Sequence, residues 1–261
     1  MKFCVLGSGS KGNATYVEAG GIRLLIDAGM SCRELERRME IKSIHPEQLD
    51  ALLITHEHGD HVNGLDLFAA KFNVPVYANE GTAEVCERQI RSHKHTPPEF
   101  AVFQSRVPFA LGELTITPVP ISHDVAEAVA YTLEEGAAKL GYFTDLGFVS
   151  EEVSTALSGC TALILESNHD LELLRTSGRP WNLVSRISGE VGHLSNEQAC
   201  EAIANHCPET LKTLLLAHLS HDCNDPELAL SLMRATLQSL GREEVQLAIA
   251  AQEVPSAFFS L

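Results

Sequence analysis

Short apolar runs and amphipathic stretches alternate along the chain and are separated by glycine-containing turns. Runs that alternate with period two, or that are continuously apolar over a few residues, predict strands. The predicted strands are residues 3–6, 15–18, 22–27, 51–54, 74–77, 114–120, 129–133, 139–143, 162–165, 211–217 and 245–250. Helices are predicted for residues 33–39, 65–72, 82–90 and 195–206, and from 225–226 onward. No repeat, low-complexity tract or linker interrupts this order, so we expect a single domain over residues 1–261.

Turn and cap residues support several of these boundaries. Gly20-Gly21 between two apolar runs is a strong hairpin signal, and Gly136 marks a second hairpin. Ser195-Asn196-Glu197-Gln198 has the spacing of a capping box. Asp225-Pro226 is typical of a helix start, because the acid caps the helix and proline is tolerated in its first turn.

Composition indicates a soluble globular protein, with 44% hydrophobic and 21% charged residues. No apolar run is long enough to cross a bilayer, and residues 1–7 turn into glycines too early for a signal peptide, so we expect no membrane partner. Seven scattered cysteines without a Cys-x-x-Cys pair favour reduced thiols and a cytoplasmic location. The formal net charge of −16 counts against a general basic surface for nucleic acid, although a short basic stretch can still line a site.

A dense group of metal-ligand residues follows the apolar run 51–54. His56, His58, Asp60 and His61 lie within six residues, and imidazole and carboxylate groups both suit divalent zinc, manganese or iron. Histidines two residues apart do not share one face of a helix, so we expect a tight loop in which Gly59 provides the freedom to turn.

Four further predicted strands end at residues with ligand or acid–base chemistry. These residues are His123, Asp145, Glu166 and His218. One histidine at a strand end is more often structural than functional. Repetition over five strands instead predicts a common site at one edge of the sheets.

This pattern resembles that of the metallo-β-lactamase-fold hydrolases, H-x-H-x-D-H followed by single His, Asp and His ligands. The resemblance implies a four-layer αββα sandwich that binds two divalent metal ions, zinc or manganese. One metal would be held by His56, His58 and His123 and the other by Asp60, His61 and His218, with Asp145 bridging the two. Flavodiiron relatives carry Glu at the second ligand position, so His58 favours hydrolysis over oxygen reduction.

Three shorter motifs resemble the YycJ/WalJ group of this fold, which is regarded as nucleases related to ribonucleases Z and J and to the phosphodiesterase PhnP. The motifs are Ser8-Gly9-Ser10 with Gly12-Asn13, Glu166-Ser167-Asn168-His169-Asp170 and Gly192-His193-Leu194-Ser195-Asn196. Only 26 residues separate Glu166 from His193, too few for the inserted β-CASP domain of some related nucleases.

The resemblance and the residue types together predict a mechanism. Two metals sharing a hydroxide would promote in-line attack on a phosphodiester, with Asp60 reducing the positive charge of the site. His193 is predicted to be the general acid that protonates the leaving oxygen, with Glu166 orienting it. The alternative for His193 is a polar residue that only flanks a helix cap.

Several residues are weaker candidates for substrate contact. In the loop 8–13, Ser10 and Asn13 could present polar groups to a phosphate, or the loop could be a plain tight turn. His221 could contact phosphate or only support His218. Asp27 is expected to support the ligands instead of binding metal.

The segment 175–186 contains Arg175, Arg179 and Arg186 with no acid, together with Trp181. Arginines for phosphate and an aromatic ring for a base would suit a single-stranded nucleic-acid end. The alternative is a helix pair whose tryptophan packs in the core, and we favour a core position for Trp181.

The function predicted from the sequence is therefore a metal-dependent phosphodiesterase that acts on nucleic acid, with an exonuclease acting on DNA implied by the resemblance alone. Two alternatives remain. One is a hydrolase of small molecules on the same fold, such as a cyclic phosphodiesterase or thioesterase. The other is a metal-binding module that cleaves no phosphodiester.

Overall fold

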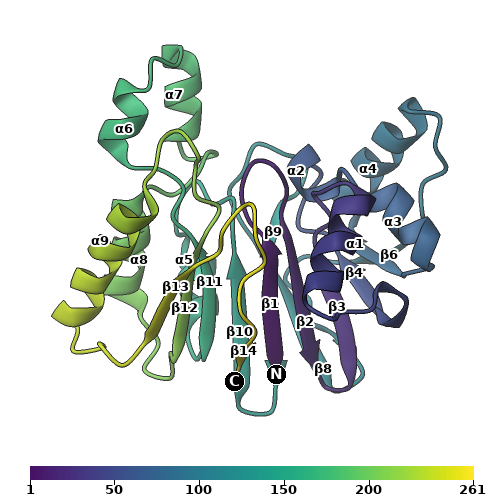
Figure 1. Cartoon of the computed structure of the whole chain (residues 1–261), viewed down its shortest axis with the longest axis horizontal. Helices are drawn as coiled ribbons and strands as arrows, with labels where there is room; N and C mark the ends of the chain where they lie inside the picture. Colours follow the sequence, from purple (N-terminus) through teal and green to yellow (C-terminus); the bar gives the residue numbers. More distant parts are fainter. The chain divides into compact units, whose positions relative to one another are not determined.

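Two mixed β-sheets and their flanking helices make up the computed structural model, which describes all residues 1–261 (Figure 1). In chain order the strands are β1 (Lys2–Gly7), β2 (Ala14–Ala19), β3 (Ile22–Ile26), β4 (Ala51–Leu53), β5 (Val76–Asn79), β6 (Phe100–Phe103), β7 (Phe109–Leu111), β8 (Leu114–Pro120), β9 (Val129–Glu135), β10 (Ala138–Phe143), β11 (Ala162–Glu166), β12 (Thr213–Ala217), β13 (Gln246–Ile249) and β14 (Phe259–Ser260). The helices are α1 (Cys32–Ile41), the 3-10 helix η1 (Pro46–Gln48), α2 (Gly59–Val62), α3 (Leu65–Phe72), α4 (Glu80–Ser92), α5 (Glu151–Leu157), α6 (Leu171–Thr176), α7 (Trp181–Ile187), α8 (Asn196–His206) and α9 (Pro226–Ser239).

The chain forms two compact units, and the first comprises residues 1–118, 125–129 and 251–261. Its sheet has the order β14-β1-β2-β3-β4-β5-β6, antiparallel from β14 to β3 and parallel from β3 to β6. Helices α1, α3 and α4 lie along one side of these strands (Figure 1). The three residues of β4 are all buried, which explains why this strand is continuously apolar instead of alternating.

The second unit comprises residues 119–124 and 130–250. Its strands run in the order β13-β12-β11-β10-β9, with β9 antiparallel to β10 and the others parallel. Helices α5, α8 and α9 supply apolar side chains to a core that includes Leu163, Leu214 and Met233. Because β10, β11 and β12 are parallel neighbours, their C-terminal ends meet at one edge.

Local signals in the sequence identified most of these elements. Gly20, Gly21 and Gly136 have φ angles of 59°, 74° and 57°, as tight hairpins between antiparallel strands require. Ser195 caps α8 in a full capping box, and Asp225 caps α9. The α/β character is confirmed, and none of the helices combines the length and apolar character needed to cross a membrane. The single domain over residues 1–261 stays a prediction.

Other elements differ from the sequence prediction. Strand β5 begins at Val76, two residues later than predicted, after Pro75, which has no backbone N–H for a sheet ladder. The short elements β6, β7, α5 and β14 were not predicted, because two to seven residues carry too little periodicity.

Candidate metal and acid–base site

The predicted metal loop of the first unit is only partly a loop. Thr55 to His58 continue from β4 in non-helical backbone, whereas Asp60 and His61 belong to the single helical turn α2. The predicted role of Gly59 is wrong, because it is the first residue of that turn and has no positive φ. The ring centroids of His56 and His58 lie 4.9 Å apart and those of His56 and His61 4.0 Å apart, so imidazole groups do converge here.

Asp27 supports this group of histidines through contacts with His61 and Thr55. Its Oδ2 lies 2.8 Å from Nδ1 of His61, and its Oδ1 accepts hydrogen bonds from the N–H and hydroxyl of Thr55 at 2.9 and 3.0 Å. The carboxyl group is completely buried, and burial raises its pKa while the interaction with His61 opposes that rise. The supporting role expected for Asp27 is thus present in the structure, and Thr55 is a partner that the motif did not reveal.

Asn13 locks the glycine-containing loop onto the metal-binding segment. Its backbone N–H donates to the carbonyl of Asp60 at 2.8 Å, and its side-chain Nδ2 lies 3.0 Å from Nε2 of His61. Its Oδ1 accepts from the N–H of Gly9 at 2.9 Å. Asn13 is fully buried, so we reassign it from substrate contact to positioning of Asp60 and His61. The loop is a tight turn, closed by a hydrogen bond between the Gly12 N–H and the Gly9 carbonyl, and its contact with a phosphate stays a prediction.

Gly29 allows the same segments to approach each other. A Cβ atom at this position would lie 1.6 Å from the carbonyl oxygen of Asp60, where no side chain fits. The N–H of Gly29 donates to the carbonyl of Asn13 at 2.9 Å, and the N–H of Ala28 donates to that of His61 at 2.8 Å. Backbone contacts from 28–29 therefore fix the position of residues 60–61.

In the second unit, three neighbouring strands deliver side chains to one edge. Asp145 follows β10, Glu166 is the last residue of β11, and His218 follows β12. Together with His193, these residues offer ligand atoms that all lie within 4.8 Å of one another. Asp145 and His218 have left-handed backbone with φ of 63° and 55°, an unfavourable conformation for residues other than glycine that clusters at functional sites.

Glu166 is the hub of this group. Its Oε1 accepts hydrogen bonds at 2.9 Å from Nδ1 of both His193 and His218, and its Oε2 accepts from the N–H groups of Leu146 and Leu194. Burial alone would raise the pKa of the carboxyl group. The positive charge of His193 and the hydrogen bonds from both histidines outweigh burial and lower the pKa of Glu166 to about 2.

The surroundings of His193 favour the protonated form of its imidazole. Burial opposes its charged form, but the neighbouring carboxylate of Glu166 prevails and raises the pKa of His193 above its ordinary value. Its ring packs edge-on against His123 and His218, with centroids 5.3 and 5.2 Å away. With Nδ1 bonded to Glu166, Nε2 is the nitrogen that remains for a substrate.

In four of the predicted histidine ligands, Nδ1 has a hydrogen-bond partner, as is usual for histidines that bind a metal through the other ring nitrogen. Nδ1 of His61 and His218 is held by a carboxylate, that of His56 by the Thr55 hydroxyl, and that of His123 by the carbonyl of Gly192 at 3.2 Å. In metal-binding histidines, such partners fix the tautomer and the orientation of the ring. The donor set of imidazole nitrogens and carboxylate oxygens in each unit therefore fits zinc or manganese.

Apart from Asn13, the tentative substrate residues lie at or near the surface. Ser10 and Arg175 are exposed, Arg179 forms an ion pair with Asp222 at 3.0 Å, and His221 also contacts Asp222. Four other histidines lie outside this site and are exposed: His45, His93, His95 and His206.

The prediction for Trp181 is wrong. The segment does form a helix pair, α6 and α7, but 77% of the tryptophan surface is exposed instead of packed in the core.

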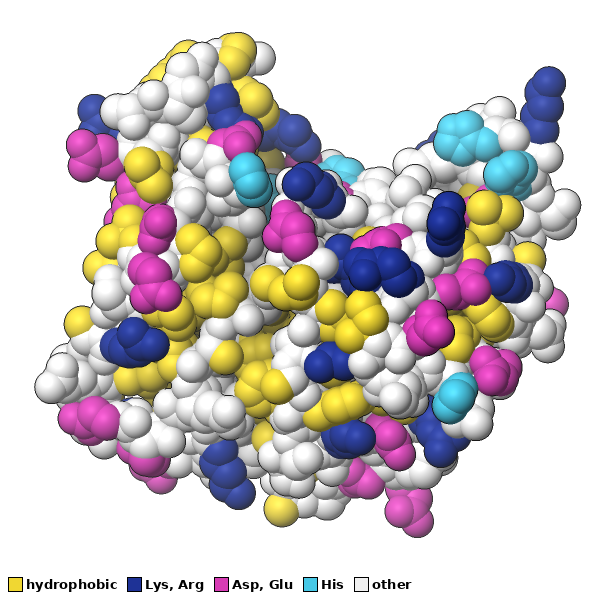
Figure 2. Space-filling model, in the orientation of Figure 1, with side chains coloured by type: hydrophobic (Ala, Val, Ile, Leu, Met, Phe, Trp, Pro, Cys, Tyr) yellow, Lys and Arg dark blue, Asp and Glu magenta, His cyan; other side chains and the backbone are white.

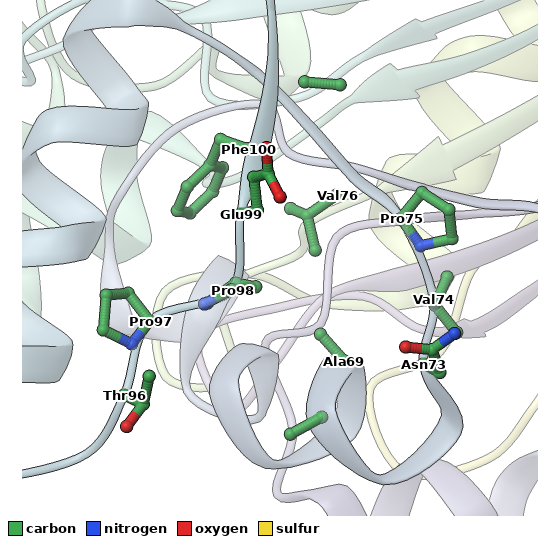
Figure 3. Close-up of a pocket in the computed structure, with 12 residues that line it drawn as sticks. Ala69, Asn73, Val74, Pro75, Val76, Thr96, Pro97, Pro98, Glu99 and Phe100 are labelled. Carbon is green, nitrogen blue, oxygen red and sulfur yellow. The ribbon is translucent and has the colours of Figure 1, made fainter.

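A pocket of about 490 Å³ in the first unit lies where the C-terminal end of α3 meets the segment before β6 (Figure 3). Apolar side chains and prolines dominate its lining, which is formed by residues 69–70, 73–76 and 96–101. None of the predicted ligands or acid–base residues lines it. This pocket is therefore separate from the residues predicted to carry the chemistry.

Comparisons with known proteins relate this chain to the β-lactamase superfamily. A model of the β-lactamase superfamily domain matches residues 22–218. Exodeoxyribonuclease YycJ of Bacillus anthracis is 37% identical over 241 residues, which cover 92% of this chain and 90% of that protein. Exodeoxyribonuclease WalJ of Streptococcus pneumoniae is 34% identical, covering 88% and 85%. Among solved structures, the metallo-β-lactamase-fold protein YhfI of Bacillus subtilis superposes with a TM-score of 0.71 at 18% identity, covering 98% and 99%.

Proposed function

Because the chain belongs to the β-lactamase superfamily, and within it to the group of exodeoxyribonucleases YycJ and WalJ, we propose that it is a metal-dependent nuclease that degrades DNA from an end. Its two mixed sheets flanked by helices are the α/β sandwich of metallo-β-lactamase-fold proteins, a family of hydrolases. The observation that carries the proposal is the similarity to YycJ over nearly the whole chain, at 37% identity.

The proposed ligand set is the one that the family pattern assigns. His56, His58 and His123 would hold one divalent ion, Asp60, His61 and His218 would hold the other, and Asp145 would serve both. The supporting observation is the anchoring of Nδ1 in four of these histidines, which fixes the orientation of each ring as in metal-binding histidines. Two zinc or manganese ions at these ligands would supply the charge that activates water and binds phosphoryl oxygens.

The residues of the chain itself provide the proton for the leaving group. Glu166 orients His193 through the 2.9 Å contact at Nδ1 and keeps the imidazole charged. In the proposed reaction, Nε2 of His193 donates its proton to the leaving oxygen of the phosphodiester. The free enzyme regains the proton from water, and Glu166 stays ionised throughout because its pKa is about 2.

One assay tests this proposal. Purified protein with zinc or manganese is incubated with end-labelled DNA, end-labelled RNA and a bis-aryl phosphodiester. We expect DNA to be shortened from an end. Cleavage of the small ester alone would contradict the nuclease proposal and favour a small-molecule hydrolase. Binding of metal without cleavage of any of the three would favour a metal-binding module.

The predicted cytoplasmic location stays a prediction. It is consistent with the thiols, because all seven cysteines are free. Burial raises the pKa of most of them, so they are also poorly reactive; for Cys86 and Cys160 the pKa rises to about 12.

A further inference from the structure

Helices α6 and α7, residues 171–187, form a small arm on the second unit, which we call the α6–α7 arm (Figure 1). Its own core consists of little more than Leu174, Val184 and Cys223. The arm turns several large apolar side chains outward: Trp181, Leu171 and Leu173 are 77%, 43% and 38% exposed. In Figure 2 hydrophobic and arginine side chains lie together on this part of the surface. Exposed apolar groups of this size indicate a binding surface.

The charge of the α6–α7 arm is opposite to that of the whole protein. The arm contains three arginines and one acid, Glu172, in a chain with a net charge of −16. Arg186 and Arg179 are paired with Asp124 and Asp222, whereas Arg175 is exposed and makes no ion pair. Arg175 is therefore the arginine of the arm that is left to contact an anionic partner.

The arm is connected directly to the proposed general acid. The backbone N–H of His193 donates to the carbonyl of Ile187, the last residue of α7, at 2.8 Å. Gly192 fits against the same helix end, where a Cβ would lie 2.2 Å from the Ile187 carbonyl oxygen. Arg186 also contacts Asp124, the neighbour of His123, at 2.6 Å. The C-terminal end of the arm is thus joined directly to the segments that carry His193 and His123.

We propose that the α6–α7 arm binds an unpaired nucleotide of the substrate, with Trp181 stacking on its base and Arg175 contacting a neighbouring phosphate. The inference rests on the proposed nuclease function and adds a preference for single-stranded ends. An exposed indole and an unpaired guanidinium match the two features of a single strand, a free base face and a phosphate. A second copy of this chain is a poorer occupant, because three apolar residues are few for a dimer interface of about 1,200 Å² or more.

Trp181 provides its own readout because it is the only tryptophan in the chain. Phosphorothioate oligonucleotides, which resist cleavage, are titrated into the metal-loaded enzyme while its fluorescence is recorded. A single strand, or a duplex with an overhang, is expected to quench the emission through stacking. A blunt duplex of the same length is expected to quench it much less. Equal quenching by both duplexes, or none by the single strand, would overturn the inference.

Substitutions separate stacking from charge. Trp181→Ala is expected to raise KM for DNA with an overhang about 10-fold at constant kcat, and Trp181→Phe to restore most of the loss, because one stacked base contributes about 1–3 kcal/mol. Arg175→Ala should weaken binding and reduce its salt dependence. Arg234→Ala on α9, an exposed arginine outside the arm, is the matched control and should do neither.

The outcomes distinguish this inference from the proposed function. If no nucleic acid is cleaved, the proposed function fails, and the fluorescence titration still decides whether the arm binds a single strand. If DNA is cleaved with the same KM by Trp181→Ala and the unsubstituted enzyme, only the inference fails. Sedimentation of both proteins completes the test, because a shift from dimer to monomer in Trp181→Ala would make the arm a self-association surface instead.

Discussion

The two units hold their site residues in different ways. In the first unit four candidate ligands come from six consecutive residues, and Asp27 supports them by bonding a single histidine, His61. In the second unit Asp145, Glu166 and His218 come from three different strand ends, and Glu166 bonds two histidines and two backbone N–H groups at once. The first arrangement is specified by local sequence. The second depends on the register of parallel strands and on one buried carboxylate, so it should be more sensitive to a single substitution.

The largest expected effect comes from the ligands themselves. Asp60→Ala should lower cleavage of DNA by about 10³-fold or more, because a charged ligand of the metals is lost. The fold should survive, since Asn13 holds residue 60 through its backbone carbonyl. Metal content and melting temperature are measured alongside activity, with the exposed Glu47→Ala as control. Full activity of Asp60→Ala would contradict the ligand assignment.

Substitution of the general acid should be nearly as severe, but only for poor leaving groups. His193→Gln is expected to lower kcat on DNA by about 10²–10³-fold, because the leaving oxygen then departs unprotonated. On a bis-aryl phosphodiester, whose leaving group needs little protonation, the loss should nearly disappear. Equal losses on both substrates would show that His193 has a role other than general acid.

The two supporting carboxylates provide the direct comparison between the units. Asp27→Asn should weaken metal binding by about 10–100-fold, and excess metal should restore activity, because only the orientation of a ligand is disturbed. Glu166→Gln should not be rescued in this way, since it loses the partner of His193 as well as that of His218. Activity measured against metal concentration checks both variants. Rescue of both to the same level would remove the distinction between the two units.

The smallest effect concerns stability and not catalysis. His169 is completely buried, neither ring nitrogen has a hydrogen-bond partner in the protein, and burial lowers its pKa to about 4. The unfolded chain takes up this proton near pH 6.5 and the folded chain only near pH 4, so stability falls as the pH decreases through this window. The loss should approach about 3 kcal/mol at pH 4.

His169→Leu tests this directly, because leucine is neutral and gives up no hydrogen bond. Denaturant unfolding of the variant should match the original protein near pH 8 and show higher stability at pH 4.5. The exposed His93→Gln serves as the control. The same pH dependence in His169→Leu would mean that another group causes the acid sensitivity.

The sequence was most informative about features that depend on neighbouring residues or that recur at several strand ends. The ligands of the first unit could be read because they follow the fully buried strand β4, and Asp145, Glu166 and His218 because each ends an apolar strand. The role of each residue within the site could not be predicted from the sequence in the same way. The motif around Asn13 is compatible with a residue that faces the substrate. Only the fold shows that Asn13 is buried.

The errors have a common physical cause. The apolar positions of α6 and α7 looked like a core face, but they pack on a core of three buried residues and leave Trp181 outside. The need for glycine at 29 arises from a carbonyl oxygen 31 residues away, that of Asp60. Periodicity describes one element at a time, so contacts between elements escape it.

The left-handed backbone at Asp27, Asp145 and His218 has a consequence for evolution and engineering. Each of these residues sits where glycine would relieve strain of about 1–3 kcal/mol, and each is instead a ligand candidate or its support. A protein under selection for stability alone would drift towards glycine or asparagine at these three positions. Among relatives, the presence of His or Asp there despite that strain is therefore a marker of retained catalysis, and stabilising designs should leave these positions unchanged.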